Sequence, residues 1–200
     1  MQRPDVSIET LTPERFAGDY EVLQEFMGGK LCCCFLPLSS CESANDHARA
    51  RSKWPADKLS LGAVAVVDGK VVGVVQMAMH GHPCDMHAVK PGECHIEHLA
   101  VSASARGHGV GTKLLKWCEE TARARGVQYL SLAVVSGNPA KRLYERFGFR
   151  DRREDVCNHA CTCLFITFFF GRPYGCCHPE WGGAVMDKPL TGGAAEVGGA

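Results

Sequence analysis

The chain has 200 residues, of which 46% are hydrophobic and 22% are charged. These fractions are ordinary for a soluble globular protein, and the length suits one domain with a single core. Lysine and arginine together number 22, as do aspartate and glutamate, so the formal net charge is zero. Because nucleic-acid binding depends mostly on surplus basic charge, this balance argues against a nucleic-acid partner.

The sequence shows no pattern of a signal peptide or a transmembrane helix. Residues 1–9 have no apolar core and carry Asp5 and Glu9, unlike a secretory signal. The longest apolar run, residues 164–170, is far shorter than the roughly 20 residues that cross a bilayer. We therefore expect an intracellular, cytoplasmic protein.

The N-terminal part of the chain favours a strand followed by helices. Weak alternation over residues 6–11 predicts a strand, and Thr12-Pro13 then provides an N-cap and a first-turn proline. Helical spacing continues to a stop at Gly28-Gly29. The apolar residues of this helix are Phe16, Tyr20, Leu23 and Met27. The polar residues 42–53 favour a second helix.

The clearest local pattern is a hairpin. Residues 63–67 and 71–79 are rich in β-branched side chains, and Asp68-Gly69 between them is a pair that two-residue hairpin turns prefer. Residues 93–101 predict the next strand. With regular alternation, its two faces carry Glu93, His95, Glu97, Leu99 and Val101 on one side, and Cys94, Ile96, His98 and Ala100 on the other.

Helices and strands alternate after this strand. An apolar stripe predicts a helix over about 109–125, which Gly126 ends, and a strand follows over 128–135. Asn138-Pro139 predicts the start of another helix, which Gly148 ends. The stripes of the two helices are Val110, Leu114, Cys118 and Ala122, and Ala140, Leu143, Tyr144 and Phe147.

The C-terminal part is expected to complete the same domain. Strands are predicted over 149–155 and 183–189, on either side of an insertion rich in Cys and Phe at about 156–182. Small residues make 191–200 a flexible tail. The order of elements predicts an α/β fold with a mixed sheet in one domain, residues 1–190.

A glycine-rich segment, Arg106-Gly107-His108-Gly109-Val110-Gly111, lies between a predicted strand and a predicted helix. Glycines let the backbone approach a ligand, and the positive end of the helix dipole favours a pyrophosphate. A dinucleotide-binding loop does not fit, because Thr112 occupies the position of the third glycine. Alone, the segment is equally compatible with a simple turn.

Two segments together resemble the Gcn5-related N-acetyltransferase (GNAT) superfamily. Arg106-x-x-Gly109-x-Gly111 is similar to its R/Q-x-x-G-x-G/A signature, after a strand that ends Leu99-Ala100-Val101-Ser102. Asn138-Pro139-Ala140-x-x-Leu143-Tyr144-x-x-x-Gly148-Phe149 is similar to its N-x-x-A-x-x-L-Y-x-x-x-G-F segment. Met186-Asp187-Lys188-Pro189-Leu190 resembles a strand that ends many members. The resemblance is strongest over 63–149.

The resemblance implies a single-domain fold whose mixed, mostly antiparallel sheet splays between its fourth and fifth strands and is flanked by helices. It implies acetyl-CoA as the acyl donor and no metal. The pantetheine arm would lie along the strand and beside Asn138, and the pyrophosphate over the loop. The implied cofactor-binding residues are Leu99, Ala100, Val101, Arg106, Gly107, His108, Gly109, Val110, Gly111, Thr112 and Asn138.

The resemblance also implies direct transfer of the acetyl group to a primary amine, without an acyl-enzyme. Tyr144 matches the general acid that protonates the departing sulfur, although it also lies on the apolar stripe of its helix. Two candidates for the base, Glu97 and His95, lie on the predicted strand before the loop. Glu97 has the chemistry that several members use, and His95 titrates near neutrality.

The 12 cysteines are unusual for a chain without an export signal. They form two clusters and a scattered group, namely Cys32, Cys33, Cys34 and Cys41, then Cys157, Cys161, Cys163, Cys176 and Cys177, and separately Cys84, Cys94 and Cys118. Their spacing fits zinc poorly. Packing thiols, or S-acylated cysteines that give peripheral membrane contact, are the alternatives.

The acceptor amine is not identified by any motif. A small amine, a protein N-terminus and a lysine side chain all remain open as acceptors. The alternative to an enzyme is a GNAT module that binds acyl-CoA without turnover and serves as a sensor or partner.

Overall fold

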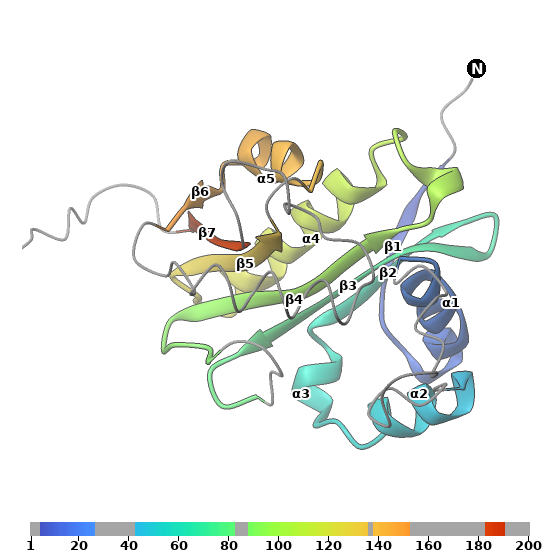
Figure 1. Ribbon diagram of the computed structural model, residues 1–200. Coiled ribbons are helices and arrows are strands. Elements are labelled where there is room, and N and C mark those ends of the chain that lie inside the picture. Colours follow the sequence, from blue (N-terminus) through green and yellow to red (C-terminus); the bar gives the residue numbers. More distant parts are fainter. Residues whose placement is uncertain (1–4, 27–42, 83–87, 136–137, 153–182, 191–200) are drawn as a thin grey trace, which may run out of the picture.

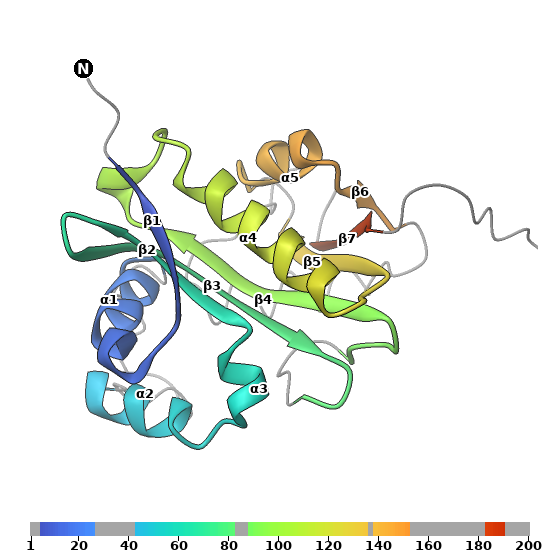
Figure 2. The ribbon, with the colours of Figure 1, turned by 180° about the vertical axis from the view of Figure 1, so that it is seen from behind.

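The computed structural model describes residues 5–26, 43–82, 88–135, 138–152 and 183–190. Its seven-stranded sheet has the order β1-β2-β3-β4-β5-β7-β6, with helices on both faces (Figures 1 and 2). The strands are β1 (Ser7–Thr10), β2 (Gly62–Val67), β3 (Lys70–Met79), β4 (Glu93–Val101), β5 (Tyr129–Val135), β6 (Arg150–Asp151) and β7 (Gly183–Pro189). The helices are α1 (Phe16–Phe26), α2 (Ala44–Arg51), α3 (Ala56–Leu59), α4 (Val110–Ala124) and α5 (Lys141–Phe147), with short 3₁₀ turns η1 (Pro13–Arg15) and η2 (Ala103–Ala105).

The sheet is antiparallel except where β4 pairs with β5. The hairpin of β2 and β3 is confirmed, and its turn residues Asp68 and Gly69 have positive φ angles of 49° and 77°. Such angles are what a two-residue turn needs to match the twist of the strands. The predicted α/β class with a mixed sheet is therefore confirmed.

Each face of the sheet has its own apolar core. On one face, α4 and α5 pack over the strands, and α4 buries Val110, Leu114, Leu115, Cys118 and Ala122. This confirms the predicted stripe of α4. On the other face, α1 packs with Phe16 and Val22 against valines of β2 and β3. Figure 2 shows α4 crossing the sheet, with α1 behind it.

The pairing of β4 with β5 stops halfway along both strands. Residues Glu93 to Ile96 pair with Tyr129 to Leu132, while the remainder of β4, up to Val101, has no β5 partner. Strand β7 meanwhile pairs along the whole of β5. The sheet therefore splays between its fourth and fifth strands, as the sequence resemblance implied.

The predicted alternation of β4 is wrong beyond Ile96. Gln76 of β3 pairs with His98 and Met77 pairs with Ile96, so Glu97 is an extra, bulged residue. Before the bulge Ile96 faces the core under α4, and after it Leu99 lies on that same side. A bulge inserts one residue into the strand. Even-numbered residues therefore face α4 before the bulge, and odd-numbered residues face it afterwards.

Two predicted helix starts differ from the structure. Thr12-Pro13 opens the 3₁₀ turn η1, and α1 begins only at Phe16. Asn138 Oδ1 accepts a hydrogen bond from Ala140 N at 2.9 Å and so closes a turn before α5, which begins at Lys141. In α1 the residue buried one turn after Phe16 is Asp19 rather than Tyr20.

Several predictions concern residues outside the described part. They include the stop at Gly28-Gly29, the insertion at 156–182, the tail at 191–200, and every cysteine except Cys94 and Cys118. Those two thiols are buried in the core under α4, where burial raises the pKa of Cys94 to about 12. Among the described residues, no helix combines the length and the apolar character needed to cross a bilayer.

Candidate active site

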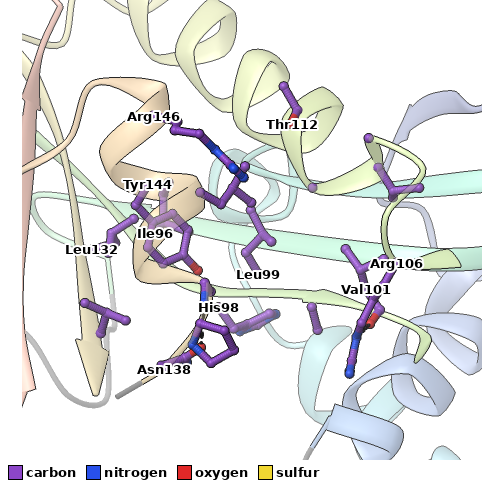
Figure 3. A pocket seen from close by; sticks show the side chains of 18 of the residues that line it. Ile96, His98, Leu99, Val101, Arg106, Thr112, Leu132, Asn138, Tyr144 and Arg146 are labelled. Atoms are coloured by element: carbon purple, nitrogen blue, oxygen red, sulfur yellow. Dashed lines mark hydrogen bonds between the residues drawn. The ribbon is translucent and has the colours of Figure 1, made fainter. Parts of the chain in front are cut away.

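A cavity of about 620 Å³ lies where β4 and β5 separate (Figure 3). Its walls come from β4, the loop before α4, the start of α4, β5 and α5. Most of the residues expected from the sequence line it, namely Glu97, Leu99, Ala100, Val101, Arg106, Gly107, Gly109, Val110, Gly111, Thr112, Asn138 and Tyr144. His95 and His108, also expected at the site, are not among the lining residues.

The loop before α4 depends on its glycines. Gly107 and Gly109 have φ angles of 78° and 83°, in the left-handed region that favours glycine. Gly111 leaves room for a neighbouring side chain, because a Cβ there would make a tight contact of 3.1 Å with Leu143 Cδ2. Arg106 Nε donates to Val101 O at 3.0 Å and so ties the loop to the end of β4.

This loop ends at the N-terminus of α4, with Gly109 as the N-cap residue. The backbone N–H groups of a first helical turn have no partner within the helix, and the helix dipole adds partial positive charge there. An anion such as a phosphate is therefore favoured at this side of the cavity. His108 is exposed on the loop, and its ring atom Nδ1 lies 2.9 Å from the carbonyl oxygen of Arg106.

Tyr144 lines the opposite wall of the cavity, from α5. Its side chain is buried against the core, where its ring meets Phe149 edge-on at 6.1 Å between centroids. Burial, and to a smaller extent the neighbouring Cys118 thiol, raises the pKa of Tyr144 to about 12. The phenol therefore keeps its proton at neutral pH and is available as a donor.

Glu97, the bulged residue of β4, lines the cavity with a carboxylate that is only partly engaged. Its Oε1 pairs with Lys58 Nζ of α3 at 3.1 Å. Its Oε2 is buried and has no hydrogen-bond partner among the described residues. A buried carboxylate oxygen without a partner is costly, so this atom suits a ligand N–H group.

His95 belongs to a separate buried network, which explains why it does not line the cavity. Its Nδ1 lies 2.8 Å from Ser131 Oγ, and that hydroxyl donates to Glu93 Oε1 at 2.5 Å. Because the hydroxyl proton goes to Glu93, His95 Nδ1 must be the donor to Ser131. Arg152 lies 3.8 Å from the same Glu93 oxygen and pairs with Asp187 at 2.6 Å.

Sequence patterns gave no role to three buried charged residues on the α1 side of the sheet. Asp19, Arg51 and Lys58 are at most 2% exposed. Arg51 Nε lies 2.7 Å from Asp19 Oδ2, and the guanidinium lies 4.6 Å from the centre of the Trp54 ring. Asp19 appeared to be a surface position of its helix, so no local pattern could have identified this cluster.

The cluster reaches the cavity through His98, which lines it. Arg51 Nη2 lies 3.3 Å from His98 Nε2, and since arginine can only donate, Nε2 is the acceptor. Burial, followed by the positive charge of Arg51, lowers the pKa of His98 to about 3. His98 is therefore neutral and carries its proton on Nδ1.

No group of three or more metal-ligating side chains occurs within the described ranges. The arrangement at the cavity is instead one of backbone donors, a buried phenol and a carboxylate. This chemistry is suited to holding an anionic ligand and to moving protons.

Comparison with curated proteins gives partial matches. The chain is 39% identical over 92 residues to an uncharacterised N-acetyltransferase of Methanocaldococcus jannaschii, covering 45% of this chain and 53% of the relative. It is 35% identical over 88 residues to the aminoalkylphosphonate N-acetyltransferase of Salmonella typhimurium, covering 44% and 54%. The matched region thus spans about half the length of these relatives.

The fold is shared with solved structures. A GCN5-related N-acetyltransferase from Kribbella flavida matches with a TM-score of 0.63 and 23% identity, over 92% of this chain and 98% of the other. At that identity the match speaks for the fold alone. Residues 30–149 match the acetyltransferase (GNAT) family. That match covers more than half of the sequence, and the chain belongs to the GNAT acetyltransferase family.

Proposed function

We propose that this chain is an acetyl-CoA-dependent N-acetyltransferase that transfers the acetyl group directly to a primary amine. The observation that carries the proposal is the cavity at the β4–β5 split, which the glycine loop, Glu97 and Tyr144 all line. Membership of the GNAT family supports acetyl-CoA as the donor. The family by itself leaves the acceptor open.

The cofactor side of the cavity fits coenzyme A in shape and charge. The half of β4 that has no β5 partner, from Glu97 to Val101, has one free edge. Its backbone groups there are available to the amides of the pantetheine. The left-handed Gly107 and Gly109 and the start of α4 suit the pyrophosphate. Asn138, whose Oδ1 is held by the α5 turn, lines the cavity beside this path.

Acetyl-CoA supplies the activated thioester when bound, and two side chains would manage the protons. Attack by the amine nitrogen forms the C–N bond while the C–S bond breaks. Tyr144, which lines the cavity and carries its proton at neutral pH, gives that proton to the departing sulfur. Glu97 takes the proton that the amine loses, through the oxygen left without a partner. His95 remains the second candidate for the base, although it does not line the cavity.

The direct test is acetyl transfer from acetyl-CoA to a panel of small amines, peptide N-termini and lysine peptides. The acetylated product should be measured by mass spectrometry, because the 12 cysteines would interfere with a thiol-based assay of CoA release. We expect product with at least one amine class. Binding of acetyl-CoA without any product would instead favour the non-catalytic module.

A further inference from the structure

Two consecutive polar residues of β4, Glu97 and His98, line the cavity and differ in hydrogen-bonding character. They lie at the bulge, within the run from Ile96 to Val101 that lines the cavity as a whole. Glu97 Oε2 is a buried acceptor oxygen without a partner in the described part of the chain. A ligand group that reaches both side chains must therefore complement both of them.

His98 can act towards such a ligand only as a donor. Its Nε2 accepts from Arg51, and its lowered pKa leaves one ring proton, on Nδ1. The ligand group that complements the pair thus has N–H donors for Glu97 and an acceptor atom for His98. An amine with an oxygen atom on the neighbouring carbon meets both requirements.

The charges around the pair favour a neutral oxygen over an anionic one. Each buried cation next to the pair is matched by a carboxylate: Arg51 by Asp19 at 2.7 Å, and Lys58 by Glu97 at 3.1 Å. A carboxylate or phosphonate at this position would add negative charge beside Glu97 and meet the neutral ring of His98, whereas the arginines that line the cavity, Arg106 and Arg146, come from the loop before α4 and from α5. Desolvating that extra charge without a cation of its own is unfavourable.

We infer that the acceptor is an amine adjacent to a neutral carbonyl, as in the α-amine of a peptide N-terminus or of an amino-acid amide. This inference rests on the proposed function and names its substrate class. Glu97 receives the amine, and His98 donates from Nδ1 to the carbonyl oxygen of the same residue. Arg51 acts as a positioning residue, because its hydrogen bond to Nε2 fixes the tautomer of His98.

The test compares kcat/KM for alanine amide and isopropylamine, which lacks the carbonyl, in the wild type and in His98→Leu. The two amines differ in basicity, so their kcat/KM values cannot be compared directly. The decisive quantity is, for each amine, the ratio of kcat/KM in the wild type to kcat/KM in His98→Leu. We expect roughly a tenfold loss for alanine amide, the size of one neutral hydrogen bond, and less than about a twofold change for isopropylamine. His98→Asn keeps a donor near the same position and should retain most of the activity on the amide.

Two controls keep folding apart from recognition. Acetyl-CoA binding should be unchanged in both His98 variants, and His80→Leu, at an exposed histidine outside the cavity, should leave both amines unaffected. Equal losses for both amines in His98→Leu would overturn the inference, since His98 would then serve the acetyl group or the fold. The same holds if His98→Asn is as impaired on the amide as His98→Leu.

The choice of substrate separates this inference from the proposed function. Preference of the wild type for free alanine, for 1-aminoethylphosphonate or for a lysine side chain over alanine amide would overturn the inference and leave N-acetyl transfer intact. Failure to acetylate any amine would overturn the proposed function, and the inference with it.

Discussion

The two sides of the cavity are built in opposite ways. The cofactor side consists of backbone, glycines and apolar side chains from the end of β4, the following loop and the start of α4. The other side rests on a buried charged cluster in which Asp19, Arg51 and Lys58 support Glu97 and His98. The first side binds through main-chain groups, and the second through side chains whose charges are matched in pairs.

This difference bears on how each side tolerates change. A backbone site fails when a side chain intrudes or a glycine conformation is lost, whereas a charged cluster fails when one partner is removed and the other stays buried. In the proposed function the first side would hold acetyl-CoA and the second would meet the acceptor.

The largest effect is expected from Gly109→Val, which adds a side chain at a residue that lines the cavity. We expect acetyl-CoA affinity to fall by at least about a hundredfold, measured by calorimetry, because the backbone can no longer approach the pyrophosphate. Gly126, at the other end of α4, is a matched control: its φ is 70° against 83° for Gly109, and at both a Cβ would meet no atom within 4 Å.

Both glycine variants should therefore lose similar stability through backbone strain, roughly 1–2 kcal/mol. Only Gly109→Val should lose binding. If Gly126→Val weakens acetyl-CoA binding equally, the loss reflects strain in α4 and not a blocked site.

The next largest effect concerns Tyr144→Phe, which removes only the hydroxyl. We expect kcat to fall about 10²–10⁴-fold, the usual contribution of a general acid, with little change in acetyl-CoA affinity. Steady-state kinetics on the amine identified in the panel would measure this. A kcat within about twofold of the wild type would make Tyr144 a core residue only.

Breaking the charged side should cost stability more than chemistry. Arg51→Met leaves Asp19, which is 0% exposed, with only His47 (2.7 Å) as an ion-pair partner among the described residues, and removal of one partner of a buried pair typically costs about 3–5 kcal/mol. Urea denaturation would measure this loss in the free energy of unfolding. Arg49→Met, on the same helix, removes the ion pair of Arg49 with Asp46, whose charged atoms lie 3.8 Å apart. Because the Arg49 side chain is 71% exposed, this substitution should leave the free energy of unfolding almost unchanged.

If Arg49→Met and Arg51→Met destabilise equally, the buried cluster does not support the fold. The double variant Asp19→Leu/Arg51→Met should recover part of the lost stability, because it removes both members of the Asp19–Arg51 pair.

The two candidate bases can be separated by their position. Glu97→Gln should lower kcat by about 10²-fold or more and alter the acidic limb of the pH profile of kcat/KM, because Glu97 lines the cavity. His95→Gln should do less, since His95 lies in the network with Ser131 and Glu93. The reverse pattern would assign the base to His95.

A further effect is a pH dependence of stability at His98. Its pKa in the folded protein is about 3, below the ordinary value of 6.5, so between these values the unfolded chain binds more protons. The free energy of unfolding should therefore fall as pH drops through this window, by at most about 1.4 kcal/mol per pH unit. Comparing urea midpoints of the wild type and His98→Leu at pH 6.5 and 4.5 would measure it, and identical slopes would contradict it.

The sequence alone determined the elements that carry the cofactor side. The hairpin turn at Asp68-Gly69, the stripe of α4 and the glycine loop each depend on residues close together in the chain. Periodicity, turn residues and helix termini are local properties, so they can be read before folding. Two motifs in the right order then sufficed to predict the splayed sheet.

Only the tertiary structure decided what forms the charged side of the cavity. The bulge at Glu97 arises from the register of β4 against β3, and it overturned the predicted alternation. Asp19, Arg51 and Lys58 come from three helices, and their burial depends on how those helices pack on the sheet. Charge pairing and register are non-local, because each needs partners that the chain brings together only when folded.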